Sequence, residues 1–175
     1  AARGTHMSMS SDGTIRVDFV CVHNAGRSQM AAVFAERERA ERGLDGVVEI
    51  DSAGTNPADH VAEGVVAALA EVDLDVSDRS PSYVVLDDLK QSHFLITMGC
   101  SISEFNPGHY GVESREWDLT DPEGKDAETV REVRDEIEGR VAALFDEIEA
   151  TANERAAQKS LSTRVRTAVR DALSF

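Results

Sequence analysis

Short apolar runs and helix-spaced apolar stripes alternate along the chain. The runs are rich in β-branched and aromatic side chains, which is typical of buried strands. They occupy residues 15–22, 47–50 and 93–98, with a fourth within 112–119. We therefore expect four short strands.

Between these runs, apolar positions recur every three or four residues, which predicts helices packed by one face. The predicted helices cover residues 28–42, 56–72, 86–91 and 126 onwards. In the second of them, Asn56 and Pro57 are expected as N-cap and first helical position. The last has the longest stripe: Val130, Val133, Ile137, Val141, Leu144, Phe145 and Ile148.

Strands that alternate with helices predict an α/β domain around a parallel sheet. The 175 residues are enough for one such domain, which we place at residues 9–150. Residues 1–8 are expected to be a cloning remnant and a disordered start. Residues 151–175 form a basic extension, with five cationic against two acidic side chains. This extension is either an amphipathic tail or an expression-derived addition, and we assign it no role.

The composition is strongly acidic, with 33 Asp and Glu against 18 Lys and Arg and a net charge of −15. Such a charge argues against a nucleic-acid partner. No apolar run approaches the roughly 18–20 residues that span a bilayer, and no signal peptide is recognised, so we expect no membrane partner and a cytoplasmic location. Only three of the cations are Lys. The protein is therefore either an ordinary acidic protein or one adapted to molar salt.

The chain has two cysteines, Cys21 and Cys100, too few for a disulfide scaffold or an all-cysteine zinc site. No spacing of His, Cys and Asp suggests a metal site, and we expect no bound cofactor. The thiols are then either inert core residues or reactive ones.

The junction between the first strand and the first helix has the pattern C-x5-R-S. A loop of this length before a helix can turn successive backbone N–H groups inward and bind an oxyanion. The candidate oxyanion-binding residues are Val22, His23, Asn24, Ala25, Gly26 and Arg27. Arg27 can hold two oxygens of a tetrahedral anion, while the positive field and the Ser28 hydroxyl favour the thiolate of Cys21. The alternative is a buried cysteine with an arginine at this spacing by chance.

Two further residues are expected at the same edge of the sheet, where the strands end. Asp121 in Thr120-Asp121-Pro122 can act as a general acid, although Asp-Pro is also an ordinary turn signal. Cys100 is either a thiol that forms a disulfide with Cys21 or a buried strand-end residue. The histidines His23 and His60 are taken as structural or solvent-facing.

Several of these motifs, in order, resemble the low-molecular-weight protein tyrosine phosphatase superfamily, in particular its arsenate reductase branch. The resemblance extends over about residues 15–150. It is carried by FVCVHNAGRSQMA (19–31), DSAGT (51–55), DLDVSDRSP (73–81), LITMGC (95–100), EWDLTDPEGK (116–125) and VREVRDEI (130–137). It implies a flavodoxin-like three-layer fold with a four-stranded parallel sheet.

For the site, the resemblance implies Cys21 as nucleophile, Arg27 as oxyanion clamp and Asp121 as general acid. Gln29, where the phosphatases usually have proline, favours the reductases. So does Glu-Gly after Pro122, where the phosphatases typically place tyrosines. Two departures stand out. No cysteine follows Cys100 in SISEFNP, so the three-cysteine relay of thioredoxin-coupled members cannot operate as it does there. Ala32 replaces a glutamate that binds potassium in some members.

These observations lead to a hypothesis of thiol-dependent arsenate reduction through a Cys21 adduct, resolved by Cys100 or an external thiol. The expected partners are a small oxyanion (arsenate, with phosphate or sulfate as analogues) and a thioredoxin-like protein or low-molecular-weight thiol. The main alternative is phosphomonoester hydrolysis through a Cys21 phosphocysteine. A third possibility is an oxyanion-binding or redox-sensing module without turnover.

Overall fold

The fold is a four-stranded parallel sheet in the order β2-β1-β3-β4, covered by helices. The computed structural model describes residues 13–174, so the cloning remnant and disordered start expected at 1–8 lie outside the described residues. The strands are β1 (Ile15–Cys21), β2 (Val48–Gly54), β3 (Phe94–Met98) and β4 (Glu113–Glu116). The helices are α1 (Arg27–Glu41), α2 (Glu63–Ala70), α3 (Leu86–Leu89) and α4 (Ala127–Ala172), with a 3-10 turn η1 (Pro107–Tyr110). The predicted flavodoxin-like α/β fold is confirmed.

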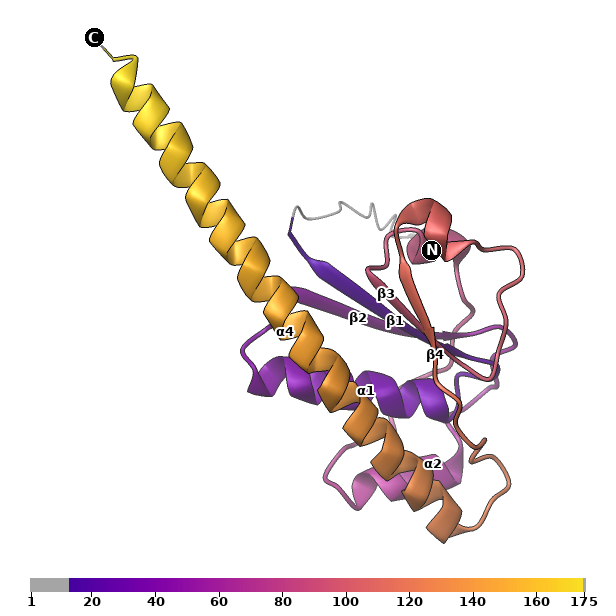
Figure 1. Ribbon diagram of the computed structural model, residues 1–175. Helices are drawn as coiled ribbons and strands as arrows, with labels where there is room; N and C mark the ends of the chain where they lie inside the picture. Colours follow the sequence, from indigo (N-terminus) through magenta and orange to yellow (C-terminus); the bar gives the residue numbers. More distant parts are fainter. Residues whose placement is uncertain (1–12, 175) are drawn as a thin grey trace, which may run out of the picture.

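The central strand β1 is buried on both faces, which explains why its sequence is almost continuously apolar. Phe19 and its alternate neighbours face the large core formed with α1, α2 and α4. Val20 points to the opposite face, where it packs with Leu89 of α3, Leu95, Phe105 and Val112. Figure 1 shows the three longer helices gathered on one side of the sheet. The sheet is therefore the middle of three layers.

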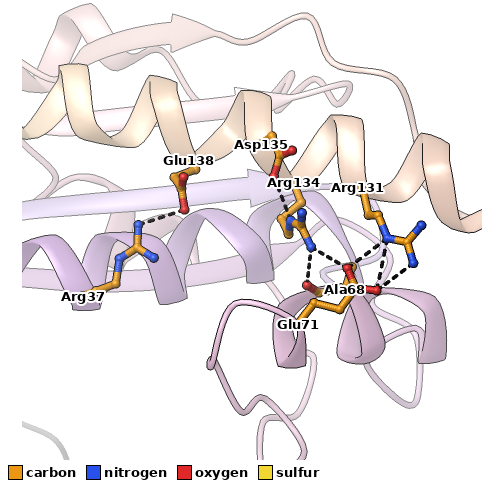
Figure 2. A network of polar contacts seen from close by, with 7 residues as sticks. All are labelled: Arg37, Ala68, Glu71, Arg131, Arg134, Asp135 and Glu138. Atoms are coloured by element: carbon orange, nitrogen blue, oxygen red, sulfur yellow. Dashed lines mark hydrogen bonds and ion pairs between the residues drawn. The ribbon is translucent and has the colours of Figure 1, made fainter.

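Ion pairs connect α4 to the other two helices of its layer, α1 and α2 (Figure 2). Arg37 of α1 donates to Glu138 at 2.9 Å. Glu71, just after α2, accepts from both Arg131 and Arg134, and Arg134 also donates to the backbone carbonyl of Ala68 at 2.7 Å. Because its guanidinium is satisfied in this way, Arg134 can lie buried between two helices.

The helix α4 continues far beyond the domain (Figure 1). Asp126 caps its start by accepting from the Thr129 N–H at 2.9 Å. Its buried stripe runs from Val130 to Ala152, after which the side chains are exposed, apart from partly covered Arg155. The basic extension is thus a helical continuation, and its exposed apolar residues recur every four positions: Leu161, Val165, Val169 and Leu173.

Two sequence predictions about local structure are wrong. The second strand is longer than expected, because residues 51–54 of the DSAG motif continue β2 and pair with β1 up to Gly54 and Cys21. The helix expected from Asn56 and Pro57 begins only at Glu63. Residues 55–62 instead run alongside the loop that follows β1, and their N–H groups donate to its carbonyls. Those tertiary hydrogen bonds outweigh the local helix-start signal.

Candidate active site

The loop at residues 22–26 lies between the end of β1 and the start of α1, close to the middle of the sheet. Cys21 is the last residue of β1 and aligns with Gly54 of β2 and Met98 of β3. Its thiol is free and its side chain is buried. The strand order therefore places this thiol at the carboxyl edge of the sheet, where parallel α/β folds bind their ligands.

Residues 55–62, here called the strap, hold the loop from outside. The N–H groups of Thr55, Asn56, Ala58 and Ala62 donate to the carbonyls of Cys21, Val22, His23 and Ala25, at 2.8–3.1 Å. In a trans peptide, the C=O of one residue and the N–H of the next point in opposite directions. Carbonyls turned toward the strap therefore leave the N–H groups of Val22, His23, Asn24 and Gly26 directed to the inner side of the loop. This arrangement is a nest of the kind that binds anions.

The sulfur of Cys21 lies within reach of two donors. The backbone N–H of Asn24 donates to Sγ at 3.2 Å, and the Ser28 Oγ lies 2.9 Å from Sγ. Asn24 adopts a left-handed backbone conformation with φ of +50°, which asparagine tolerates better than most residues. Both groups are therefore close enough to hydrogen-bond the sulfur, and a thiolate is the nucleophile of cysteine chemistry.

Arg27 provides the positive charge of the site. Its Nη1 donates to the carbonyl of Leu119 at 3.4 Å, and its Nη2 lies 3.7 Å from a carboxylate oxygen of Asp121. The guanidinium rests against Gly99, at the end of β3. The segments that follow β3 and β4 thus hold Arg27, which belongs to α1. Its side chain lies buried at the base of the site.

A small pocket of about 20 Å³ opens between the loop and the segment after β4. Cys21, Arg27 and Asp121 all line it, as do Pro122 and Glu123. No Phe, Tyr or Trp is among its lining residues in the described part of the chain. The rim is polar: Nδ1 of His23 lies 2.8 Å from Glu123 Oε2, and Asp121 is half exposed. The pocket is therefore small and has a polar rim.

Cys100 lies near this site, but its side chain packs on the other face of the sheet. Its Sγ lies 3.5 Å from the carbonyl oxygen of Val20, and it contacts the small cluster that includes Leu95 and Phe105. Cys21 belongs to the opposite cluster. Burial raises the pKa of the Cys100 thiol above its usual value. Both cysteines are free in this structure.

The structure brings together most of the predicted site residues. Cys21, Arg27 and Asp121 line one pocket and Ser28 contacts its sulfur, whereas Cys100 is not among the pocket-lining residues and packs against the second cluster. His60 is solvent-exposed, as expected.

Two contributors were missed by the sequence interpretation: the strap and Gly54. A Cβ on Gly54 would lie 2.6 Å from the Val22 carbonyl oxygen. The glycine in DSAGT was the signal for this close approach.

Neither a metal site nor a membrane-spanning helix is found among residues 13–174. No three His, Cys, Asp or Glu side chains there are grouped as metal ligands would be. None of the helices in that part combines the length and apolarity that a membrane span requires.

Comparison with known proteins shows the family to which the chain belongs. Residues 16–155 match the family model for low molecular weight phosphotyrosine protein phosphatase. The chain therefore belongs to that family.

Proteins named arsenate reductase are among its relatives and structural neighbours. A Halobacterium salinarum protein named "Putative arsenate reductase" is 51% identical over 139 residues, which cover 79% of this chain and 96% of the relative. A solved thioredoxin-dependent arsenate reductase from Corynebacterium glutamicum is 33% identical, with a TM-score of 0.65 over 81% of this chain and 65% of the other. This chain thus spans just under two thirds of that protein. An arsenate reductase solved in a phosphate-binding state is 27% identical, with a TM-score of 0.64 over 77% of this chain and 99% of the other.

Proposed function

We propose that this protein reduces arsenate to arsenite with a thiol as the reductant. The observation that carries the proposal is the position of the Cys21 sulfur. It lies within hydrogen-bonding distance of the Asn24 N–H and the Ser28 Oγ, beside Arg27, in a pocket of about 20 Å³ that no aromatic side chain among residues 13–174 lines. The similarity to arsenate reductases supports the same chemistry.

In the first step, arsenate binds in the loop at residues 22–27, with its oxygens on the inward N–H groups and on Arg27. The Cys21 thiolate attacks arsenic, and an S–As bond forms as one As–O bond breaks. Asp121 donates a proton to the departing oxygen, which leaves as water. The location of Asp121 on the pocket wall beside Arg27 supports this role.

In the second step, a thiolate attacks Sγ of Cys21. A disulfide forms, the S–As bond breaks, and its electron pair stays on arsenic, which leaves as arsenite. The attacking thiol is Cys100 or an external thiol, and the resulting disulfide is then reduced by a thioredoxin-like protein or a low-molecular-weight thiol. Atoms and charge balance because arsenic gains the two electrons that the two sulfurs lose.

The family match also supports a second function, hydrolysis of phosphomonoesters. The same thiolate, clamp and acid would form and break a phosphocysteine, and no second thiol would be needed. Among residues 13–174, no Phe, Tyr or Trp lines the pocket, which favours arsenate over an aryl phosphate.

The decisive experiment compares both activities in one preparation, in molar KCl, with thioredoxin and several small thiols as donors. We expect arsenate turnover to exceed aryl-phosphate hydrolysis, and Cys21→Ser to abolish it. Phosphatase activity alone would contradict the proposal. A full rate for Cys100→Ser would assign the second step to the external thiol.

A further inference from the structure

A continuous chain of hydrogen bonds connects the Cys21 sulfur to a guanidinium near the surface, far away in sequence. Arg79 Nε donates to Gln29 Oε1 at 2.7 Å, and Gln29 Nε2 donates to Asn24 Oδ1 at 3.1 Å. Asn24 Nδ2 then donates to Ser28 Oγ at 2.7 Å, and Ser28 Oγ lies 2.9 Å from the sulfur. The three intermediate side chains are buried, whereas Arg79 is partly exposed.

The direction of these bonds is fixed by two groups that can only donate. An arginine N–H has no acceptor capacity, so the atom of Gln29 that faces Arg79 must be its oxygen, and its NH₂ must face Asn24. The backbone N–H of Ser82 also donates to Asn24 Oδ1, at 3.0 Å. The NH₂ of Asn24 is therefore directed at Ser28.

This direction determines the state of the Ser28 hydroxyl. Its oxygen already accepts from Asn24, which leaves its single proton free to be donated to the sulfur. A hydroxyl that donates to sulfur stabilises the thiolate, whereas one that accepts from the thiol does not. Successive bonds of the same direction also polarise one another.

We propose that Arg79 is a positioning residue for the nucleophile: through Gln29 and Asn24, it orients Ser28 so that the hydroxyl proton is directed at Cys21. Glu36 holds the guanidinium by accepting from its Nη1 at 2.9 Å. The segment at residues 77–82 therefore contributes to the reactivity of the site without touching the pocket.

The test measures how fast iodoacetamide alkylates Cys21 as a function of pH, in a Cys100→Ser background where no other cysteine remains. We expect Arg79→Met and Gln29→Met each to move the alkylation profile to higher pH, with a rate at pH 7 reduced roughly threefold. Because both changes break the same chain, the double variant should shift no further than either single variant.

Arg131→Met is the matched control, because it also removes a guanidinium that is paired with a glutamate, Glu71, and Arg131 does not line the pocket (Figure 2). It should alter stability but leave the profile in place. An unchanged profile for folded Arg79→Met would overturn the proposal. A shift in Arg79→Met without a shift in Gln29→Met would also overturn the proposal, because that result indicates only the loss of a charge. Additive shifts in the double variant would also overturn it.

The inference rests on the proposed role of Cys21 as nucleophile. Alkylation reports on the thiol whether or not arsenate is turned over. A protein inactive toward arsenate could still show the shift, and an active one could lack it, so the two proposals can fail separately.

Discussion

The guanidinium of Arg27 occupies the space that a side chain on Gly99 would need. A Cβ atom built on Gly99 would lie 2.5 Å from Nη1 of Arg27. Gly99 also has a φ of +71°, a conformation that residues with a Cβ rarely adopt. The glycine after β3 therefore makes room for the guanidinium of Arg27.

Substitution of Gly99 should disable the site more than it destabilises the fold. We expect Gly99→Ala to displace Arg27 and to lower phosphate affinity and arsenate turnover by about tenfold or more, since a bidentate guanidinium contact would be lost. Calorimetric phosphate titration and a turnover assay measure the two effects. Gly111→Ala is the matched control, because Gly111 has a φ of +69° and open space around its Cα. Similar loss of binding in both variants would show that backbone strain, not the clamp, is responsible.

The two arginines that hydrogen-bond Glu71 predict that the free energy of unfolding depends on pH. Hydrogen bonds from Arg131 and Arg134 lower the pKa of Glu71 to about 2, from an ordinary value of 4.5. A carboxylate whose pKa is lowered by folding contributes its full stabilisation at pH values above the pKa of the unfolded state. This contribution declines as the pH falls from 4.5 toward 2. Urea unfolding of the parent and of Glu71→Gln should therefore differ at pH 6 and converge toward pH 2.5. A constant difference across this range would contradict the prediction.

The Cys100 thiol should react slowly at neutral pH. Because burial raises its pKa, the thiolate fraction is small at pH 7 and increases as the pH rises. In Cys21→Ser, we expect alkylation of Cys100 to accelerate by about tenfold per pH unit up to that raised pKa. The comparison is the unfolded protein, in which the pH profile of Cys100 alkylation should lie at lower pH. Coincident profiles would mean that the folded environment does not protect this thiol.

The exposed part of α4 should be dispensable for folding and for the proposed activity. Side chains at 156–174 are all exposed, and Ala152 is the last buried residue of the helix. A chain ending at residue 158 should unfold at the same denaturant concentration as the parent and keep its arsenate turnover. A chain ending at residue 147 loses buried Ile148 and should be destabilised by about 2–5 kcal/mol, as for other large losses from a core. Loss of activity in the longer truncation would assign the extension a role.

The acidic charge predicts stabilisation by salt. A net charge of −15 repels itself in dilute buffer, and molar salt reduces the screening length to about 3 Å. We expect both the unfolding temperature and arsenate turnover to rise from 0.1 to 2 M KCl. The similarity to a Halobacterium protein agrees with this adaptation. Full stability and activity in dilute buffer would identify an ordinary acidic protein instead.

The predictability of each element depended on where its stabilising contacts lie. β1 and α4 were recognised because their apolar patterns record burial within a single segment. The strap has the local signals of a helix start in Asn56 and Pro57, but four of its N–H groups donate to carbonyls more than 30 residues earlier. β2 was cut short because the polar residues of DSAG obscured a strand that is buried on alternate positions.

The sequence by itself determined the class of fold, the C-x5-R-S loop and the candidate residues in it, because those depend on residue type and short-range spacing. Only the tertiary structure decided how they act together. It turned the loop carbonyls toward the strap and seated Arg27 against Gly99. It directed Cys100 to the other face of the sheet and connected Arg79 to the sulfur through buried amides. Each of these relationships joins segments far apart in sequence, and hydrogen-bond direction and steric exclusion exist only once those segments have packed.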